Sequence, residues 1–227
     1  MLIRHAQASF GAADYDRLSL RGERQAELLG LWIAAHPEWS VQRLVRGTMR
    51  RHAQTLDAIV RACAAAGRVL PAVEEDAGWN EFDHVALFRA YATRHAEDER
   101  VPLMLREPGS PVVHRLIGDM FAAWARGDLD GAMPESWENF SMRVRQAFDA
   151  LAQTPGQTLV VSSGGSIARC AQAALGIDDA RTIALNLSLA NSAISHFRHR
   201  DDRWDLLDWN TLPHLAAAEH LPLTSHY

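Results

Sequence analysis

Apolar residues follow two patterns along this chain. In some stretches they recur every three to four residues, and in others they form short unbroken runs. The first pattern is typical of helices with one buried face, and the second of strands inside a sheet. Helices are predicted over 20–36, about 50–66, 136–151 and 164–174, and strands from residue 2 and over 42–45, 69–73, 158–162, 193–198 and 204–210. This alternation predicts an α/β fold: a three-layer αβα sandwich with a mostly parallel central sheet, ending in an antiparallel hairpin.

Capping and helix-breaking residues indicate where these elements end. Ser19 suits the N-cap of the first helix, Pro37 stops it, and Gly67 closes the second helix. Residues 14–19 are predicted to form a polar loop, and residues 76–83 a stretch rich in turns.

The stretch from about residue 84 to 131 interrupts the alternation. Its pattern is helical but irregular, with charged runs and breaks at Pro102, Pro108 and Pro111. We interpret it as a helical insertion that covers one side of the sheet, within a single domain of residues 1–227. Substrate specificity is expected to depend on this insertion, and its apolar residues suggest a homodimer.

Composition narrows the class of partner and the compartment. The 227 residues are 48% hydrophobic with a net charge of -5, which argues against binding nucleic acid or an anionic membrane. The absence of lysine excludes lysine-dependent chemistry. No apolar run is long enough to span a membrane, and Cys63 and Cys170 are expected to be buried free thiols. A cytoplasmic protein without a signal peptide is therefore expected.

Charged and small residues follow several of the predicted strands, at the sheet edge where α/β proteins bind ligands. Arg4 and His5 come after the first strand, Arg50 and Arg51 open the second helix, and Glu81 follows the third apolar segment. Ser162-Ser163-Gly164-Gly165 opens a helix whose free N–H groups suit an anion. Each feature alone has a plain alternative: a solvated arginine, a capping acid or a tight turn. Together they suit a phosphoryl group attacked by a histidine and protonated by a carboxylic acid.

Six segments in the same order resemble the histidine phosphatase superfamily, the phosphoglycerate-mutase-like proteins. Leu2-Ile3-Arg4-His5-Ala6 looks like its Arg-His-Gly signature, and Leu18 to Ala26 resembles Leu-Ser-x-x-Gly-x-x-Gln-Ala. Gly47 to Thr55 is similar to Ser-x-Leu-x-Arg-Ala-x-Gln-Thr, and Trp79-Asn80-Glu81 to Leu-x-Glu. Val160 to Gly165 resembles Val-Val-Ser-His-Gly-Gly, and Asn191-Ser192 a later Asn-x-Ser turn.

The resemblance implies a role for each matched residue. His5 would be the nucleophile that becomes phosphohistidine, and Arg4 and Arg51 would hold the transferring oxygens, together with Ser163 and Gly164. Glu81 would protonate the leaving group and then activate water. Glu74 competes for the role of acid, but the strand predicted before it favours Glu81. No metal or organic cofactor is implied.

Two departures from the family pattern affect the expected activity. Ala6 adds a methyl group where the family has glycine. Ser163 replaces the second family histidine, and the loss of a charge-assisted hydrogen bond would cost about 1.5–3 kcal/mol, or roughly ten- to a hundredfold. Another histidine could reach the pocket instead, with His52, His84 and His196 as candidates, although a structural or surface role is the commoner fate of such residues.

These features predict a phosphomonoester hydrolase of reduced or unusual activity that acts on a small phosphorylated substrate. A phosphoglycerate-mutase-type phosphotransferase is one alternative. The other alternative is a protein that binds a phosphorylated ligand and has lost turnover. Ser163 argues for this alternative, and the presence of His5 and Glu81 argues against it.

Overall fold

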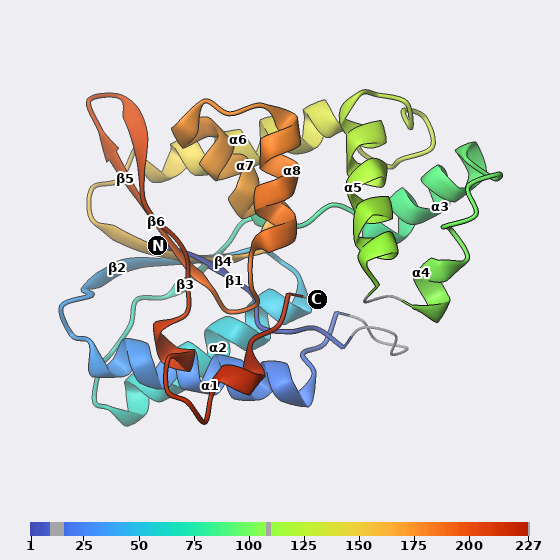
Figure 1. Ribbon diagram of the computed structural model, residues 1–227. Helices are drawn as coiled ribbons and strands as arrows, with labels where there is room; N and C mark the ends of the chain where they lie inside the picture. Colours follow the sequence, from blue (N-terminus) through green and yellow to red (C-terminus); the bar gives the residue numbers. More distant parts are fainter. Residues whose placement is uncertain (10–15, 108–109, 227) are drawn as a thin grey trace.

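A six-stranded sheet forms the centre of the molecule (Figure 1). The computed structural model describes residues 1–9, 16–107 and 110–226. The strands are β1 (Leu2–Arg4), β2 (Val41–Arg46), β3 (Val73–Glu75), β4 (Gln157–Ser162), β5 (Ile194–Arg200) and β6 (Arg203–Thr211). Their order is β3-β2-β4-β1-β5-β6, with the first four parallel and the last two antiparallel. The predicted α/β fold, mostly parallel sheet and final hairpin are confirmed.

Helices cover both faces of the sheet (Figure 1). They are α1 (Leu20–Ala35), α2 (Arg50–Ala65), α3 (His84–Arg94), α4 (Leu103–Arg106), α5 (Pro111–Ala125), α6 (Trp137–Leu151), α7 (Gly164–Leu175) and α8 (Asp179–Ser188). Helices α1 and α2 lie on one face and α6, α7 and α8 on the other, while α3 to α5 extend beyond the carboxyl ends of β1 and β4. Short 3-10 helices span Ala77–Trp79, Pro213–Leu215 and Leu221–Leu223.

Alternating side chains of the inner strands supply two separate cores, one for each layer of helices. In β1, Leu2 packs with the core under α5, α6 and α7, while the next residue, Ile3, packs with the core under α1 and α2. In β4, Val160 belongs to the first core and Leu159 and Val161 to the second. The inner strands are therefore held from both sides, so that their carboxyl ends are fixed relative to each other.

The third strand was predicted in the wrong place. The predicted strand over 69–73 contains Pro71, which has no N–H to donate to a sheet, and Val69 is 97% exposed. Pairing with β2 begins only at Val73, which lies opposite Leu44. The strand is exposed throughout and lies at the edge of the sheet.

Most helix boundaries follow the prediction, but one helix was missed. Ser19 caps α1 as expected, since its hydroxyl accepts from the Gly22 N–H at 3.1 Å. Helix α8 was not predicted, although Asp178 marks its start by accepting from the Arg181 N–H at 2.8 Å. Within 84–131 the structure forms α3, α4 and α5. Residues 14–15 of the predicted polar loop and Pro108 lie outside the described residues.

Two expectations from composition can be compared with the structure. Cys63 and Cys170 are both buried and both free. Within residues 1–9, 16–107 and 110–226, none of the helices is long and apolar enough to cross a bilayer.

Candidate active site

His5 lies directly after β1 and is 5% exposed. Its Nδ1 lies 2.7 Å from the Ala6 carbonyl oxygen, which can only accept, so Nδ1 carries the proton. Nε2 is then the unprotonated nitrogen, and it accepts a hydrogen bond from Arg51 Nε at 3.1 Å. Burial, followed by the charges of Arg51 and Arg4, holds the pKa of His5 well below its usual value. The imidazole is therefore neutral, and the unprotonated Nε2 directs its lone pair at the Arg51 guanidinium.

Arg51 is brought to His5 by the first turn of α2 and is 4% exposed. Its Nη1 contacts Asp16 Oδ1 at 2.7 Å, and Asp16 Oδ2 accepts from the Arg50 backbone N–H, also at 2.7 Å. Asp16 therefore fixes both the arginine and the start of the helix. The sequence analysis missed this residue because nothing in its spacing separates it from other loop acids.

Arg4 approaches the same place from the end of β1. Its Nη1 donates to the Leu189 carbonyl, and a Cβ at Gly164 would lie 3.6 Å from its Nε. The arginine thus lies beside the N-terminus of α7, where N–H groups without a partner inside the helix and the helix dipole favour an anion. Two guanidinium groups and a helix N-terminus meet next to His5.

Glu81 reaches the site from the loop that precedes α3. Its Oε2 accepts from the Gly165 N–H at 3.0 Å, and a Cβ at residue 165 would lie 2.3 Å from Oε1, so only glycine allows this approach. Burial raises the pKa of the Glu81 carboxyl, and the Gly165 N–H, Arg51 and Arg4 oppose that effect. Glu74, the competing acid, lies at the sheet edge and binds Arg43 through both oxygens, at 3.0 and 2.7 Å.

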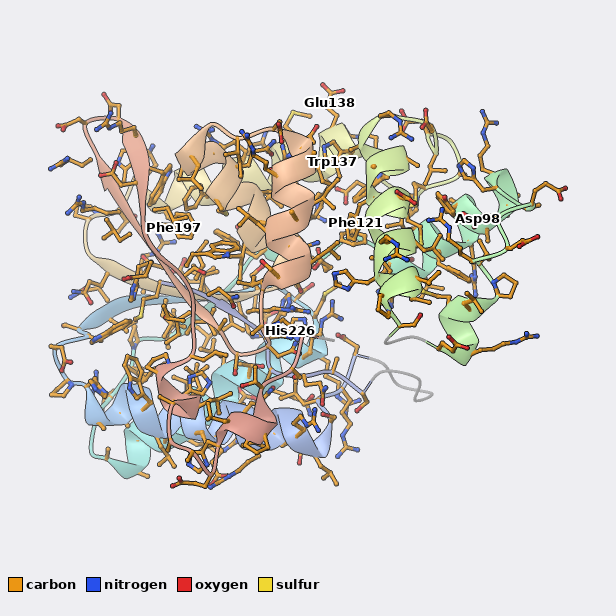
Figure 2. The ribbon with its side chains drawn as sticks, in the orientation of Figure 1. Asp98, Phe121, Trp137, Glu138, Phe197 and His226 are labelled. Carbon is orange, nitrogen blue, oxygen red and sulfur yellow. The ribbon has the colours of Figure 1, made fainter. Side chains whose placement is uncertain are left out.

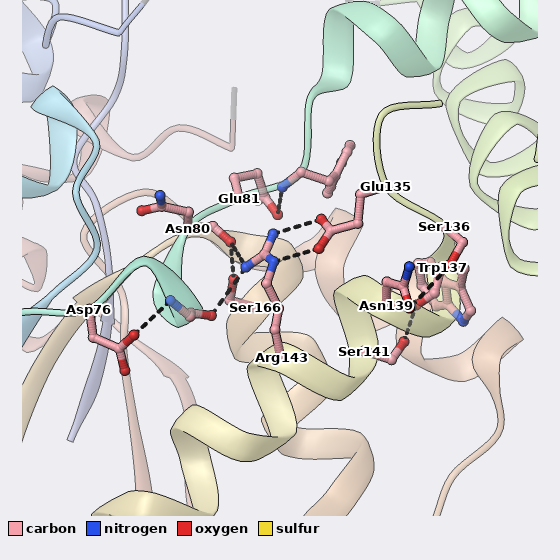
Figure 3. Close-up of polar contacts among 12 residues, drawn as sticks. Asp76, Asn80, Glu81, Glu135, Ser136, Trp137, Asn139, Ser141, Arg143 and Ser166 are labelled. Carbon is pink, nitrogen blue, oxygen red and sulfur yellow. Dashed lines mark hydrogen bonds and ion pairs between the residues drawn. The ribbon is translucent and has the colours of Figure 1, made fainter. Parts of the chain in front are cut away.

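The loop that carries Glu81 is fixed by Arg143 of α6 (Figure 3). Arg143 Nη1 donates to the carbonyls of Gly78 and Asn80 at 3.1 and 2.8 Å, and the same guanidinium binds Glu135 through both oxygens. Two serine hydroxyls hold the same loop by donating to its backbone carbonyls. Ser166 Oγ donates to the Asn80 carbonyl at 3.0 Å, and Ser162 Oγ donates to the Trp79 carbonyl at 2.7 Å. Arg143 was not identified from sequence.

Replacing Arg143 with methionine should lower the free energy of unfolding by about 2–3 kcal/mol, because charged hydrogen bonds to partly buried partners are lost. Arg145 on the same helix is the matched control, since within the described residues its side-chain hydrogen bond goes to the half-exposed Asp149 at 2.6 Å. The Arg145→Met change should cost about 0.3–0.5 kcal/mol. Urea unfolding of both variants measures the difference, and equal losses would show that Arg143 does not hold the loop.

The methyl group of Ala6 does not point at the proposed phosphate position. Ala6 is fully buried and packs in a small cluster with Leu18, Ala26 and Ala58, between α1 and α2. Its N–H donates to Thr55 Oγ1 at 3.1 Å. The departure from glycine is thus accommodated by the helix layer.

Of the three histidines considered as substitutes for the missing family histidine, one reaches position 163. His52 Nε2 lies 2.7 Å from Ser163 Oγ, and both residues are fully buried. His196 lies in the hairpin, paired with Asp208 Oδ2 at 2.9 Å. His84 begins α3, and burial followed by the charge of Arg51 lowers its pKa.

The C-terminal segment adds a histidine that the sequence analysis did not consider. His226 lies near the carboxyl end of the inner strand β1 (Figure 2). Its pKa is lowered by burial and by the charges of Arg4 and His114. Ser225 fixes this segment by contacting Gln25 Nε2 at 3.0 Å and Asn191 Oδ1 at 2.9 Å.

A family model of the histidine phosphatase superfamily, branch 1, matches residues 1–212, and the chain belongs to this superfamily. A search of curated proteins finds no match.

Solved structures of phosphatases and mutases share the fold. A phosphoglycerate mutase from Bacillus anthracis is 16% identical with a TM-score of 0.62, covering 94% of this chain and 92% of that chain. A putative alpha-ribazole-5'-P phosphatase from Escherichia coli is 18% identical with a TM-score of 0.62, covering 92% and 95%. A mycobacterial glucosyl-3-phosphoglycerate phosphatase is 21% identical with a TM-score of 0.59, covering 92% and 96%.

Proposed function

We propose that this protein is a phosphomonoester hydrolase that works through a phosphohistidine at His5. The observation that carries the proposal is the state of the His5 ring. Its Nδ1 proton is committed to the Ala6 carbonyl, and its Nε2 lone pair faces the Arg51 guanidinium. A neutral nucleophile beside an anion-binding arginine is what attack on a phosphate ester requires.

In the first step, His5 Nε2 forms a bond to phosphorus while the ester P–O bond breaks. Glu81 takes part in its acid form, which burial favours by raising its pKa, and donates its proton to the leaving oxygen. Arg4, Arg51 and the N-terminus of α7, with Ser163 and Gly164, bind the phosphoryl oxygens as charge shifts between them.

In the second step, the Glu81 carboxylate takes a proton from water as the water oxygen bonds to phosphorus. The P–N bond then breaks and releases inorganic phosphate and neutral His5. Glu81 ends protonated again, so both residues return to their starting states. No step calls on a cofactor.

We propose that a small phosphorylated molecule is the substrate and that residues 1–227 act as a single domain. Helices α3 to α5, within 84–131, extend beyond the carboxyl ends of β1 and β4 and form the insertion that selects the substrate (Figure 1). Two of the similar structures are named as phosphatases of small phosphorylated compounds, which supports this substrate class.

The test is whether the purified wild-type chain hydrolyses 4-nitrophenyl phosphate at mildly acidic pH. We expect saturable release of nitrophenol and phosphate in equal amounts, and no isomerisation of phosphoglycerate in a parallel assay. Isomerisation would instead identify a mutase-type phosphotransferase. Binding of inorganic phosphate without turnover would identify a protein that binds phosphorylated ligands and has lost catalysis.

A further inference from the structure

His52 is fully buried next to His5, between Gly47 and Ser163. It is the third residue of α2, and its ring centroid lies 5.7 Å from that of His5. Its Nε2 contacts Ser163 Oγ at 2.7 Å. Its Nδ1 lies against the Gly47 backbone, which raises the pKa of the ring, but it makes no hydrogen bond of normal geometry within the described part of the chain. The contact joins residues that are 111 positions apart.

Gly47 makes this position of the imidazole available. A Cβ at residue 47 would lie 2.3 Å from His52 Nδ1 and 2.7 Å from Asn80 Oδ1, closer than real side chains come. The superfamily pattern has serine, alanine and histidine where this chain has Gly47, His52 and Ser163. The three departures therefore lie together in the structure. The absence of a side chain at Gly47 leaves room for the His52 ring, and the His52 ring contacts Ser163.

Ser163 directs its hydroxyl at His52 instead of capping its own helix. It is the N-cap residue of α7, yet its side chain accepts no hydrogen bond from the helix N–H groups. Its neighbours Gly164 and Gly165 lie against Arg4 and Glu81. The serine hydroxyl is therefore next to the groups proposed to bind the phosphoryl oxygens.

The direction of the hydrogen bond follows from the ligand. Phosphoryl oxygens only accept, so Ser163 must donate its one proton to them and accept a hydrogen bond from its other neighbour. His52 meets this need when the one proton of its neutral ring is on Nε2, so the proposal assigns the proton there and not to Nδ1 beside the Gly47 backbone. Burial, and then the charges of Arg51 and Arg46, hold the pKa of His52 well below its usual value, although the backbone contact with Gly47 acts in the opposite direction.

We propose that His52 and Ser163 replace the missing histidine as one unit, in which His52 positions the Ser163 hydroxyl to donate a hydrogen bond to a phosphoryl oxygen. Ser163 is the group that touches the substrate, and His52 is its positioning residue. This inference rests on the proposed phosphate site, and it changes the expectation that Ser163 is a simple loss.

A double-mutant cycle separates this role from a contact that only fills the core. Glutamine and methionine have side chains of equal length, but only glutamine carries an N–H donor. We therefore compare His52→Gln, His52→Met, Ser163→Ala and the double variant His52→Met/Ser163→Ala. Calorimetric affinity for inorganic phosphate and kcat/KM for 4-nitrophenyl phosphate are measured, with thermal unfolding as the control for folding.

Ser163→Ala should weaken both quantities by about 10- to 100-fold, since a charge-assisted hydrogen bond is lost. His52→Met should cost about tenfold and His52→Gln less than about threefold. In the Ser163→Ala background, His52→Met should cost nothing more, because its only route to the ligand is gone. Independent losses that multiply, or equal losses for the Gln and Met variants, would overturn the proposal.

A second comparison uses the residues of the superfamily pattern. Ser163→His alone should lower activity, because its ring must share the space that His52 holds 2.7 Å away. His52→Ala/Ser163→His should recover what the single change loses. Higher activity of the single variant than of the wild type would show that Ser163 is a simple loss and would overturn the proposal.

These measurements also distinguish failure of the inference from failure of the proposed function. If the wild type binds inorganic phosphate with the expected coupling but hydrolyses nothing, the hydrolase proposal fails and the His52–Ser163 unit stands. If the wild type hydrolyses the aryl phosphate and the cycle is additive, only the unit fails.

Discussion

Replacement of His5 with alanine is expected to lower kcat for aryl phosphate hydrolysis by about 10⁴-fold or more, the usual cost of removing a catalytic nucleophile. The variant has no nitrogen to form the bond to phosphorus. Arg4, Arg51 and the start of α7 remain, so its affinity for inorganic phosphate should change by less than about tenfold. The loss should therefore lie in kcat and leave phosphate binding largely intact.

The control for the His5 variant is His196→Ala, which removes another imidazole far along the chain. His196 lies in the β5–β6 hairpin and binds Asp208 at 2.9 Å. Its loss should leave the kinetic constants unchanged. If the His5 variant keeps wild-type turnover, the nucleophile lies elsewhere and the phosphohistidine proposal is wrong. Rapid quenching with radiolabelled substrate should also leave label on the wild-type chain and none on the His5 variant.

The parts of the site that strand ends position could be predicted from sequence. His5 follows a buried strand and Ser163 follows another, and the carboxyl ends of parallel neighbours lie together. Register places Arg4 opposite Ser162, so the residues after them are adjacent. Sequence patterns capture this because each apolar run and the polar residues that follow it are adjacent along the chain.

Contacts between helices and loops could not be predicted in this way. His52 was one of three histidine candidates, and only the placement of the first turn of α2 next to the end of β4 brings it to Ser163. Asp16 and Arg143 act through contacts 35 and 63 to 65 residues away along the chain. Their residue types are common on surfaces, so the local pattern carries no signal of their partners.

Replacement of Glu81 with glutamine should have an effect that depends on the leaving group. A general acid contributes typically about 10²- to 10⁴-fold, and an alkyl phosphate needs that proton on its leaving oxygen. The turnover of alkyl phosphates should therefore fall by about that factor. Nitrophenolate leaves without protonation, so transfer to His5 from 4-nitrophenyl phosphate should continue. Water attack then lacks its base, and the phosphorylated chain should accumulate after a burst of nitrophenol.

The matched control is Glu74→Gln, which changes the other candidate acid in the same way. Glu74 binds Arg43 at the sheet edge, so its replacement should leave turnover of both substrate types unchanged. Equal losses in the rate of phosphoryl transfer to His5 from alkyl and aryl substrates, with no burst of nitrophenol, would contradict a role of Glu81 in proton transfer and indicate a structural one.

The same pair of variants predicts how activity changes with pH. Attack requires neutral His5 and protonated Glu81. The lowered pKa of His5 keeps the nucleophile neutral well into the acidic range, and the raised pKa of Glu81 keeps the acid protonated above the range of an ordinary carboxyl. Turnover of alkyl phosphates should thus be highest at mildly acidic pH and fall as pH rises through the Glu81 pKa. Because glutamine does not titrate, the fall on the alkaline side should disappear in Glu81→Gln and persist in Glu74→Gln.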